Sequence, residues 1–170
     1  MLQGFKEKIL KKKLLQLISN QQQKQVSEVK KIQTIGIVTS LAVASKINLA
    51  LEIERELQVK GVTQYNLVKV LPKEEITKQQ FTEKDINLKG EFTQPEFKNF
   101  LNKPFDLLIG YFSESNVFLE SAVAQSKARF KVGFSNVNED LYLMEFSENI
   151  ENVSGFLLEL KKYLIILNKL

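Results

Sequence analysis

The stretch FDLLIGYF, residues 105–112, decides the fold. Apart from Asp106 it is a continuous apolar run, and a run of this length is typical of a strand that is covered on both faces. IQTIGIV (32–38) and FKVGF (130–134) have the same character. Strands buried on both faces belong to parallel sheets, so we expect a mainly parallel sheet between two layers of helices.

Strands and helices alternate along the rest of the chain. Further strands are predicted at YNLVKVL (65–71) and LYLMEF (141–146), with short strands near 76–81 and 86–92. Helices are predicted at residues 2–18, 46–60, 93–101, 116–128 and 154–169.

This alternation predicts a three-layer α/β sandwich, Rossmann-like and doubly wound, with a mainly parallel sheet of about five strands. Residues 32–38 are expected beside residues 105–112 and parallel to them. The strand order should reverse direction between these two strands.

Local signals set two of the helix ends. Ser45 is the predicted N-cap of the helix at 46–60, and Gly61 is expected to end it. TQPE (93–96) reads as a capping box with a proline in the first turn, and it predicts a short helix that runs to Leu101.

The positive charge is concentrated near the start of the sequence. Residues 1–31 hold eight lysines and two glutamates (net +6), whereas residues 32–170 hold sixteen basic and eighteen acidic side chains (net −2). We therefore divide the chain into a basic helical arm with a polar linker (1–31) and a Rossmann-like α/β domain (32–170).

The arm is a candidate for binding an acidic partner. Its apolar residues do not form one stripe, because Leu10, Leu14 and Leu17 lie about 110° around the helix from the face that holds Phe5 and Ile9. A membrane surface is therefore less favoured than a protein or an RNA-containing assembly, contacted through residues 1–19. The lysines that would make the contact are Lys6, Lys8, Lys11, Lys12 and Lys13.

Two residue types are missing from the sequence, and this limits the chemistry. There is no cysteine, so disulfides, thiolate metal sites and cysteine nucleophiles are excluded. There is no histidine either, which excludes a Ser-His-Asp triad. No metal or cofactor site is predicted. The first twenty residues contain no apolar run long enough for a secretory signal, and no 18-residue apolar stretch occurs, so we expect a cytoplasmic protein.

The segments DINLKG (85–90), FDLLIGYF (105–112) and SKARFKVGF (126–134), together with the lysine-rich start, resemble a bacterial family annotated only as a domain of unknown function. The resemblance covers the whole chain and implies a small cytoplasmic α/β protein without a known activity. Over about 30 residues, FDLLIG followed by a helix and KARFKVGF is also similar to one Rossmann-like half of heptosyltransferase-type glycosyltransferases.

Ligands of doubly wound sheets bind beyond the carboxyl ends of the strands, where the strand order reverses. Three loops would meet there: TSLAVAS (39–45), SESN (113–116) and SNVNED (135–140). Their side chains are candidate ligands for a nucleotide or sugar phosphate, although caps and solvated turns need the same residue types. The candidates are Thr39, Ser40, Ser113, Ser115, Asn116, Ser135 and Asn136. The sequence has neither a dinucleotide fingerprint nor a P-loop.

Catalysis stays open. Glu114, Glu139 and Asp140 could share this edge of the sheet, and a buried carboxyl among them could act as an acid or base. Exposed acids in turns are the simpler explanation. Asp106 precedes its strand and should face away from the crevice.

The last predicted helix, 154–169, leaves Leu158 and Ile165 on the side opposite its core face. Either the N-terminal helix of the same chain or a second copy, in a homodimer, would cover them. We expect the N-terminal helix, because Leu10, Leu14 and Leu17 also need a partner.

The sequence thus favours a non-catalytic binding or scaffolding protein whose basic N-terminal helix docks on an acidic partner. The alternative is a reduced glycosyltransferase-like domain that binds a nucleotide or sugar phosphate at the carboxyl edge of the sheet.

Overall fold

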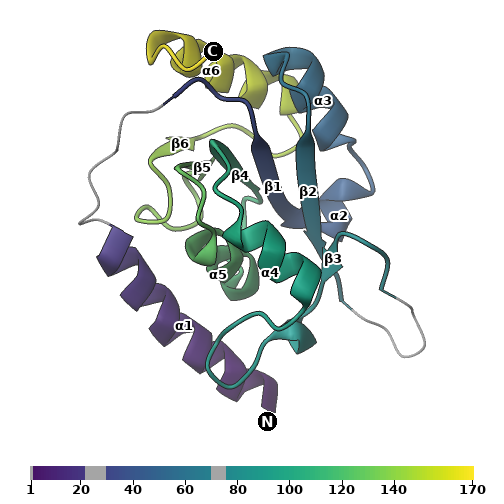
Figure 1. Ribbon diagram of the computed structural model, residues 1–170, viewed down its shortest axis with the longest axis vertical. Coiled ribbons are helices and arrows are strands. Elements are labelled where there is room, and N and C mark those ends of the chain that lie inside the picture. The colour runs from purple at the N-terminus through teal and green to yellow at the C-terminus, as the bar shows by residue number, and fades with distance from the viewer. Residues whose placement is uncertain (1, 22–29, 70–75) are drawn as a thin grey trace.

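The computed structural model describes residues 2–21, 30–69 and 76–170, and Figure 1 shows the arrangement of their elements. In chain order these are α1 (Leu2–Gln21), β1 (Ile35–Ser40), α2 (Leu41–Ala44), α3 (Leu49–Leu57), β2 (Val62–Leu67), β3 (Gln80–Phe81), the 3₁₀-helix η1 (Glu83–Asp85), α4 (Pro95–Asn102), β4 (Leu107–Tyr111), α5 (Val117–Gln125), β5 (Phe130–Phe134), β6 (Met144–Phe146) and α6 (Val153–Ile166).

Within these described residues the sheet has six strands in the order β3-β2-β1-β4-β5-β6, and every neighbouring pair is parallel. This is the strand order of the doubly wound Rossmann fold. The predicted α/β class is confirmed. The sheet has one strand more than expected, because the two-residue β3 adds itself to the free edge of β2.

The central prediction is also confirmed. β1 and β4 are parallel neighbours, with Ile35 opposite Leu107 and Thr39 opposite Tyr111. Because the two strands are parallel, the loops that follow them leave the sheet at the same edge, and the strand order reverses between them.

Helices cover both faces of the sheet (Figure 1). On one face α4 and α5 pack on the sheet through a hydrophobic cluster that includes Phe97 and Phe118. On the other face α3 and α6 pack on β1, β4 and β5, with Ile53 and Phe156 among the buried residues.

Helix α1 forms a further layer outside α5 (Figure 1). Leu10, Leu14 and Ile18 are buried and belong to the same hydrophobic cluster as α5. Hydrogen bonds hold both ends of the helix: Gln3 Nε2 donates to Glu83 Oε2 (2.7 Å), and Gln21 Nε2 donates to the Ala124 carbonyl (2.9 Å). The basic helix thus shares its core with the α/β domain.

The expectation that the N-terminal helix covers Leu158 and Ile165 is therefore wrong. α1 lies on the α5 side of the sheet, whereas α6 lies on the opposite side, and these two side chains remain 59% and 58% exposed. The alternative cover, a second copy of the chain, stays a prediction.

The segment after β1 contains two helices where one was predicted. Ser45 closes α2 as its C-cap, so its prediction as an N-cap is wrong. Asn48 caps α3 instead, with its Oδ1 accepting from Leu51 N (3.3 Å). α3 ends at Leu57, because Gln58 adopts a left-handed conformation three residues before Gly61.

The predicted capping box at residues 93–96 is also wrong. α4 begins after Gln94, whose side chain makes no capping hydrogen bond. The box that forms joins Thr82 and Asp85 and starts η1. Thr93 turns back toward this box and donates from its hydroxyl to the Asp85 carbonyl (3.1 Å).

Several element boundaries differ by a few residues from those predicted. The first strand starts at Ile35, because the Ile32 amide donates to the Lys169 carbonyl before the ladder begins. The second strand starts at Val62, and the end predicted for it, residues 70–71, lies outside the described residues. The short strand predicted near 86–92 is an isolated antiparallel bridge between Ile86 and Phe92.

Candidate functional site

The predicted crevice lies beyond the carboxyl ends of β1 and β4, and the structure brings its loops to one edge of the sheet. Thr39 is fully buried there, and its hydroxyl donates to the Tyr111 carbonyl oxygen (2.6 Å). This bond ties the two strands together at the switch point. Thr39 therefore has a structural partner within the chain.

Two further candidate residues, Ser40 and Asn116, are the N-caps of helices. Ser40 Oγ accepts from Val43 N at the start of α2 (3.4 Å). Asn116 Oδ1 accepts from two amides at the start of α5, Phe118 N (3.0 Å) and Leu119 N (3.2 Å). Both residues therefore have the capping role that the sequence analysis gave as the alternative to ligand binding.

A buried carboxylate organises the loop before α5. Glu120 is buried on α5, and its Oε1 accepts from the Ser115 hydroxyl (2.7 Å) and from the Asn116 amide (2.9 Å). We did not single out Glu120 from the sequence, where it is one acid in a helix of small residues. The sequence did contain one indication of this contact: Glu120 follows Asn116 by four residues and Ser115 by five.

The third loop carries mostly exposed polar side chains. Ser135 Oγ lies 3.1 Å from Ser147 Oγ, directly after β6, whereas Asn136 is exposed. Glu139 and Asp140 are exposed in the same turn. In the second loop Ser113 is half-buried and Glu114 is exposed. The structure does not gather the three predicted acids into one cleft.

Glu145 is a second acid that the sequence analysis missed. It lies on β6 opposite Gly133, and its Oε1 is buried without a hydrogen-bond partner among the described residues. Burial, and then the charges of Glu139 and Asp140, raise the pKa of its carboxyl above the ordinary value.

Tyr142 lies beside this acid. Its ring is buried between the sheet and α5, and its hydroxyl also lacks a hydrogen-bond partner among the described residues. Burial, followed by the charges of Glu120 and Glu145, raises the pKa of Tyr142 well above its ordinary value. Because the phenol fills the core and does not line an opening, we assign it no catalytic role. In the parts of the chain described here, no group of three or more acidic side chains is placed to hold a metal ion.

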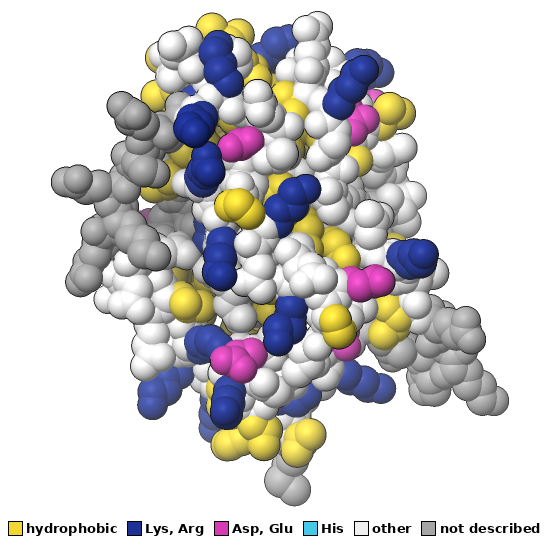
Figure 2. Space-filling view, viewed as in Figure 1, with side chains coloured by type: hydrophobic (Ala, Val, Ile, Leu, Met, Phe, Trp, Pro, Cys, Tyr) yellow, Lys and Arg dark blue, Asp and Glu magenta, His cyan; other side chains and the backbone are white. Residues whose placement is uncertain are grey.

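The second region of interest is the outer face of α1, the side turned away from α5. Its exposed side chains include both apolar and basic residues: Leu2, Phe5, Lys8, Lys12 and Leu15. Lys11 is exposed at the border of this face. In Figure 2, basic and hydrophobic side chains are interspersed at the lower left, where Figure 1 places α1.

The remaining two lysines of the helix turn toward the body. Lys6 is half-buried. Lys13 forms an ion pair with Glu91 (3.6 Å) and donates to the Lys89 carbonyl (3.3 Å). The hydrogen bond from Asn87, followed by the charge of Lys13, lowers the pKa of Glu91.

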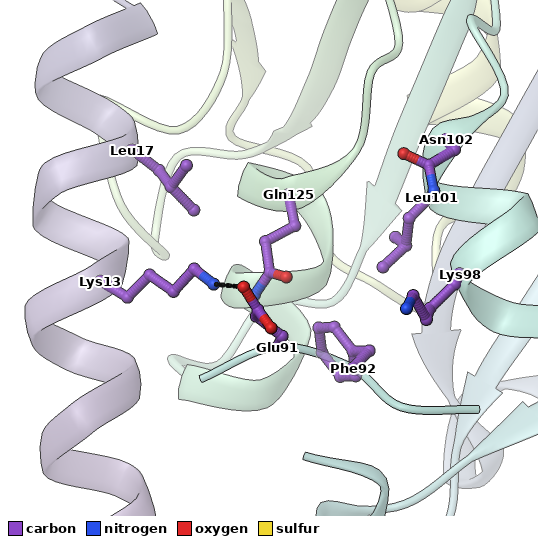
Figure 3. A pocket seen from close by; sticks show the side chains of 8 residues that line it. All are labelled: Lys13, Leu17, Glu91, Phe92, Lys98, Leu101, Asn102 and Gln125. Atoms are coloured by element: carbon purple, nitrogen blue, oxygen red, sulfur yellow. Dashed lines mark ion pairs between the residues drawn. The ribbon is translucent and has the colours of Figure 1, made fainter. Parts of the chain in front are cut away.

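A hollow of about 370 Å³ opens beside this ion pair, between α1, α4, α5 and the segment at 91–92 (Figure 3). Leu17, Phe92 and Leu101 supply its apolar wall, and Lys13 and Glu91 point toward each other across it. Gln125, which also lines it, already donates to the Gly90 carbonyl (2.9 Å). The contacts of Lys13 join α1 to the segment at 89–91. We therefore interpret this hollow as part of the packing interface between α1 and the α/β domain.

None of the helices described is both long and apolar enough to cross a membrane. Neither a curated protein nor a solved structure matches the chain significantly. A family model does match, over residues 6–167, and it includes both α1 and the α/β domain. The chain belongs to a family of unknown function, DUF6913.

Proposed function

We propose that this is a non-catalytic binding or scaffolding protein that docks onto an acidic partner through the outer face of α1. One observation carries the proposal. After α1 has packed on α5, Lys8, Lys11 and Lys12 remain exposed, and no ion pair joins them to any other described residue. Lys6 and Lys13, also predicted to bind, face the body and are left out of the proposal.

The packing of α1 favours binding because it fixes the position of these charges. Leu10, Leu14 and Ile18 are buried against the body, and the hydrogen bonds of Gln3 and Gln21 hold the two ends of the helix. A surface that is already ordered loses less conformational entropy when a partner binds.

The apolar residues on the same face favour a protein as the partner. Phe5 is 55% exposed and Leu15 is 68% exposed, and both lie next to lysines. A protein surface with acidic and apolar side chains would cover both chemistries. RNA would neutralise the lysines but would leave Leu15 in water, and α1 has no Arg, Tyr or Trp for stacking or base readout.

A membrane surface fits the arrangement less well. Lys8 and Lys12 lie on the helix between Phe5 and Leu15, so the outer face has no continuous apolar stripe. An interfacial helix needs such a stripe to enter the acyl boundary.

The alternative function, a nucleotide or sugar-phosphate site in the crevice, has less support. Thr39 is engaged by the backbone of the neighbouring strand β4, Ser40 and Asn116 by amides of the helices that they cap, and Ser115 by Glu120. A ligand there would have to replace these bonds. The crevice therefore stays a prediction and is not our conclusion.

The proposal is tested by affinity capture from a lysate of the native cells, with and without nuclease. A variant with Lys8, Lys11 and Lys12 changed to Gln is compared with a control in which three exposed lysines elsewhere, Lys46, Lys60 and Lys78, are changed to Gln. Acidic proteins captured by the wild type and the control, but not by the α1 variant, support the proposal. Capture that nuclease abolishes would identify RNA as the partner, and equal capture by both variants would refute the role of α1.

A cytoplasmic location is part of the same proposal. Fractionating the cells before the capture would test it, since the protein and its partner should appear in the same soluble fraction.

A further inference from the structure

A second hollow, which the sequence did not indicate, lies on the opposite side of the sheet from α1. It has a volume of about 370 Å³ and opens between the ends of α3 and α6, next to the segment that leads into β1. Figure 1 shows α3 and α6 side by side there, at the top of the view. It lies at the amino end of β1 and so is separate from the crevice. Its lining includes Lys31, Ile32, Leu57, Lys161, Ile165 and Lys169.

The end of α6 places Lys169 in this wall. Asn168 takes a left-handed conformation (φ 55°) directly after the C-cap residue, Leu167. The Asn168 amide then donates to the Ile165 carbonyl (2.9 Å), and the Lys169 amide donates to the Leu164 carbonyl (2.8 Å). This pair of bonds is a Schellman motif, in which the chain reverses over the last helical turn. The Lys169 carbonyl accepts from the Ile32 amide (2.8 Å), which fixes the position of the lysine backbone.

No acidic side chain in the described part of the chain forms an ion pair with Lys169, and the residue as a whole is only 5% exposed. Its Nζ lies 5.0 Å from the centroid of the Phe130 ring. Burial lowers the pKa of this lysine. A cation that is partly removed from water without an acidic side chain beside it is costly, and an anionic ligand would offset that cost.

The other groups around the hollow add positive charge above an apolar wall. Lys161 is paired with Glu56 (3.0 Å), and Lys31 donates to a main-chain oxygen of Leu170. Two of the three lysines that line the hollow are therefore engaged within the chain, and Lys169 is the third. Beside them, the side chains of Ile32, Leu57, Val59 and Ile165 form an apolar surface.

We propose that the α3–α6 hollow binds a small amphipathic oxyanion, a carboxylate or phosphate group on a short apolar body, with Lys169 as the principal counter-charge. The volume lies within the range of about 300–1,000 Å³ that is typical of small-molecule pockets. The apolar body would pack on Leu57 and Ile165, and the oxyanion would meet Lys169 and Lys31. This site lies on the other side of the sheet from the outer face of α1 and does not depend on the docking proposed there.

The test is calorimetric titration of the full chain with octanoate, hexyl phosphate, inorganic phosphate and octanol. The first two probes carry both chemistries, and each of the others carries only one. We expect octanoate, hexyl phosphate or both to bind with a dissociation constant of about 1 mM or tighter, and the single-chemistry probes to bind at least about tenfold more weakly.

Binding of octanoate alone would identify a carboxylate ligand, and binding of hexyl phosphate alone would identify a phosphate ligand. Absence of binding by both, or equal affinity for octanol or inorganic phosphate, overturns the proposal.

Two variants locate the site. Lys169→Met keeps most of the length of the side chain and removes its charge, and it should weaken binding at least about tenfold while leaving the melting temperature equal or higher. Lys162→Met changes an exposed lysine of α6 that does not line the hollow, and it should bind like the wild type. If Lys169→Met fails to fold, Lys31→Met tests the same charge from the other wall. Equal binding by the wild type and these lining variants would overturn the assignment.

Discussion

The ring of Tyr142 lies directly against the backbone of Gly133, in the space that a β-carbon on Gly133 would occupy. The same ring and its hydroxyl also cover Gly110 on the neighbouring strand. Glycine at these two positions of β4 and β5 is therefore a packing requirement, since it lets an aromatic side chain lie flat on the sheet beneath α5.

Substitution of Gly133 by Ala should lower the free energy of unfolding by about 1–3 kcal/mol, which is the usual cost of overpacking a core. Denaturant unfolding measures this change. The cost should shrink in a Tyr142→Leu background, because the overlapping ring is gone. Gly4→Ala is the control: a β-carbon there has no neighbour within 4 Å, and in a helix the change should stabilise by up to about 1 kcal/mol. An equal cost of Gly133→Ala in both backgrounds would contradict the packing described.

The two adjacent leucines of α1 should respond oppositely to truncation. Leu14 is buried against the body and Leu15 faces solvent, so Leu14→Ala should cost about 2–5 kcal/mol, whereas Leu15→Ala should change stability by less than about 0.5 kcal/mol. Urea denaturation of both variants measures the difference. Similar costs would mean that α1 does not pack on α5 through this face.

Asp106 should be a stability residue at the amino end of the sheet. Its Oδ2 accepts from the amides of Gln33 (3.1 Å) and Thr34 (3.0 Å), and Arg129 lies 3.6 Å from its Oδ1. Asp106→Ala should cost about 2–3 kcal/mol, because the amides of Gln33 and Thr34 lose a charged acceptor. Glu114→Ala, at an exposed acid, is the control for denaturant unfolding and should be neutral. A neutral Asp106→Ala would show that the loop is held by other contacts.

Two tyrosines should resist ionisation at alkaline pH. Burial raises the pKa of Tyr111 to about 12, and it raises the pKa of Tyr142 well above the ordinary value of 10. A pKa raised by folding means that the folded state holds its proton more tightly, so this stabilisation is complete below pH 10 and is lost as the pH rises toward 12 and beyond. Tyrosinate absorbance and circular dichroism, followed together, should show the buried phenols ionising only as the protein unfolds. Ionisation of all four tyrosines near pH 10 in a folded protein would contradict their burial.

The sequence predicted the sheet because continuous apolar runs carry a strong signal. The pairing of β1 with β4 followed from strand–helix alternation and right-handed crossovers, which leave few topologies. Helix ends were predicted less well. Ser45, Asn48, Thr82 and Thr93 are all residues that can cap, and the choice among them depends on contacts with distant segments, such as the bond from Thr93 to Asp85.

The candidate sites depended even more on packing. The sequence showed that α1 has scattered apolar residues, but only its contact with α5 separates buried Leu14 from exposed Leu15. Lys169 was missed for the same reason, because its burial arises where the ends of α6, α3 and the approach to β1 meet. The sequence contained one local indication that the chain reverses at the end of α6. Asn168 is of a residue type that often takes the left-handed conformation after a helix.

The most direct test of the central claim is photo-crosslinking in native cells from a reactive residue placed at Gln16, which is exposed on the outer face of α1. The matched position is Lys60, exposed and distant from α1 in the sequence. We predict an adduct with an acidic protein from position 16 only, and its loss when Lys8, Lys11 and Lys12 are changed to Gln in the same chain. The account is contradicted if position 16 gives no adduct, or if both positions capture the same proteins.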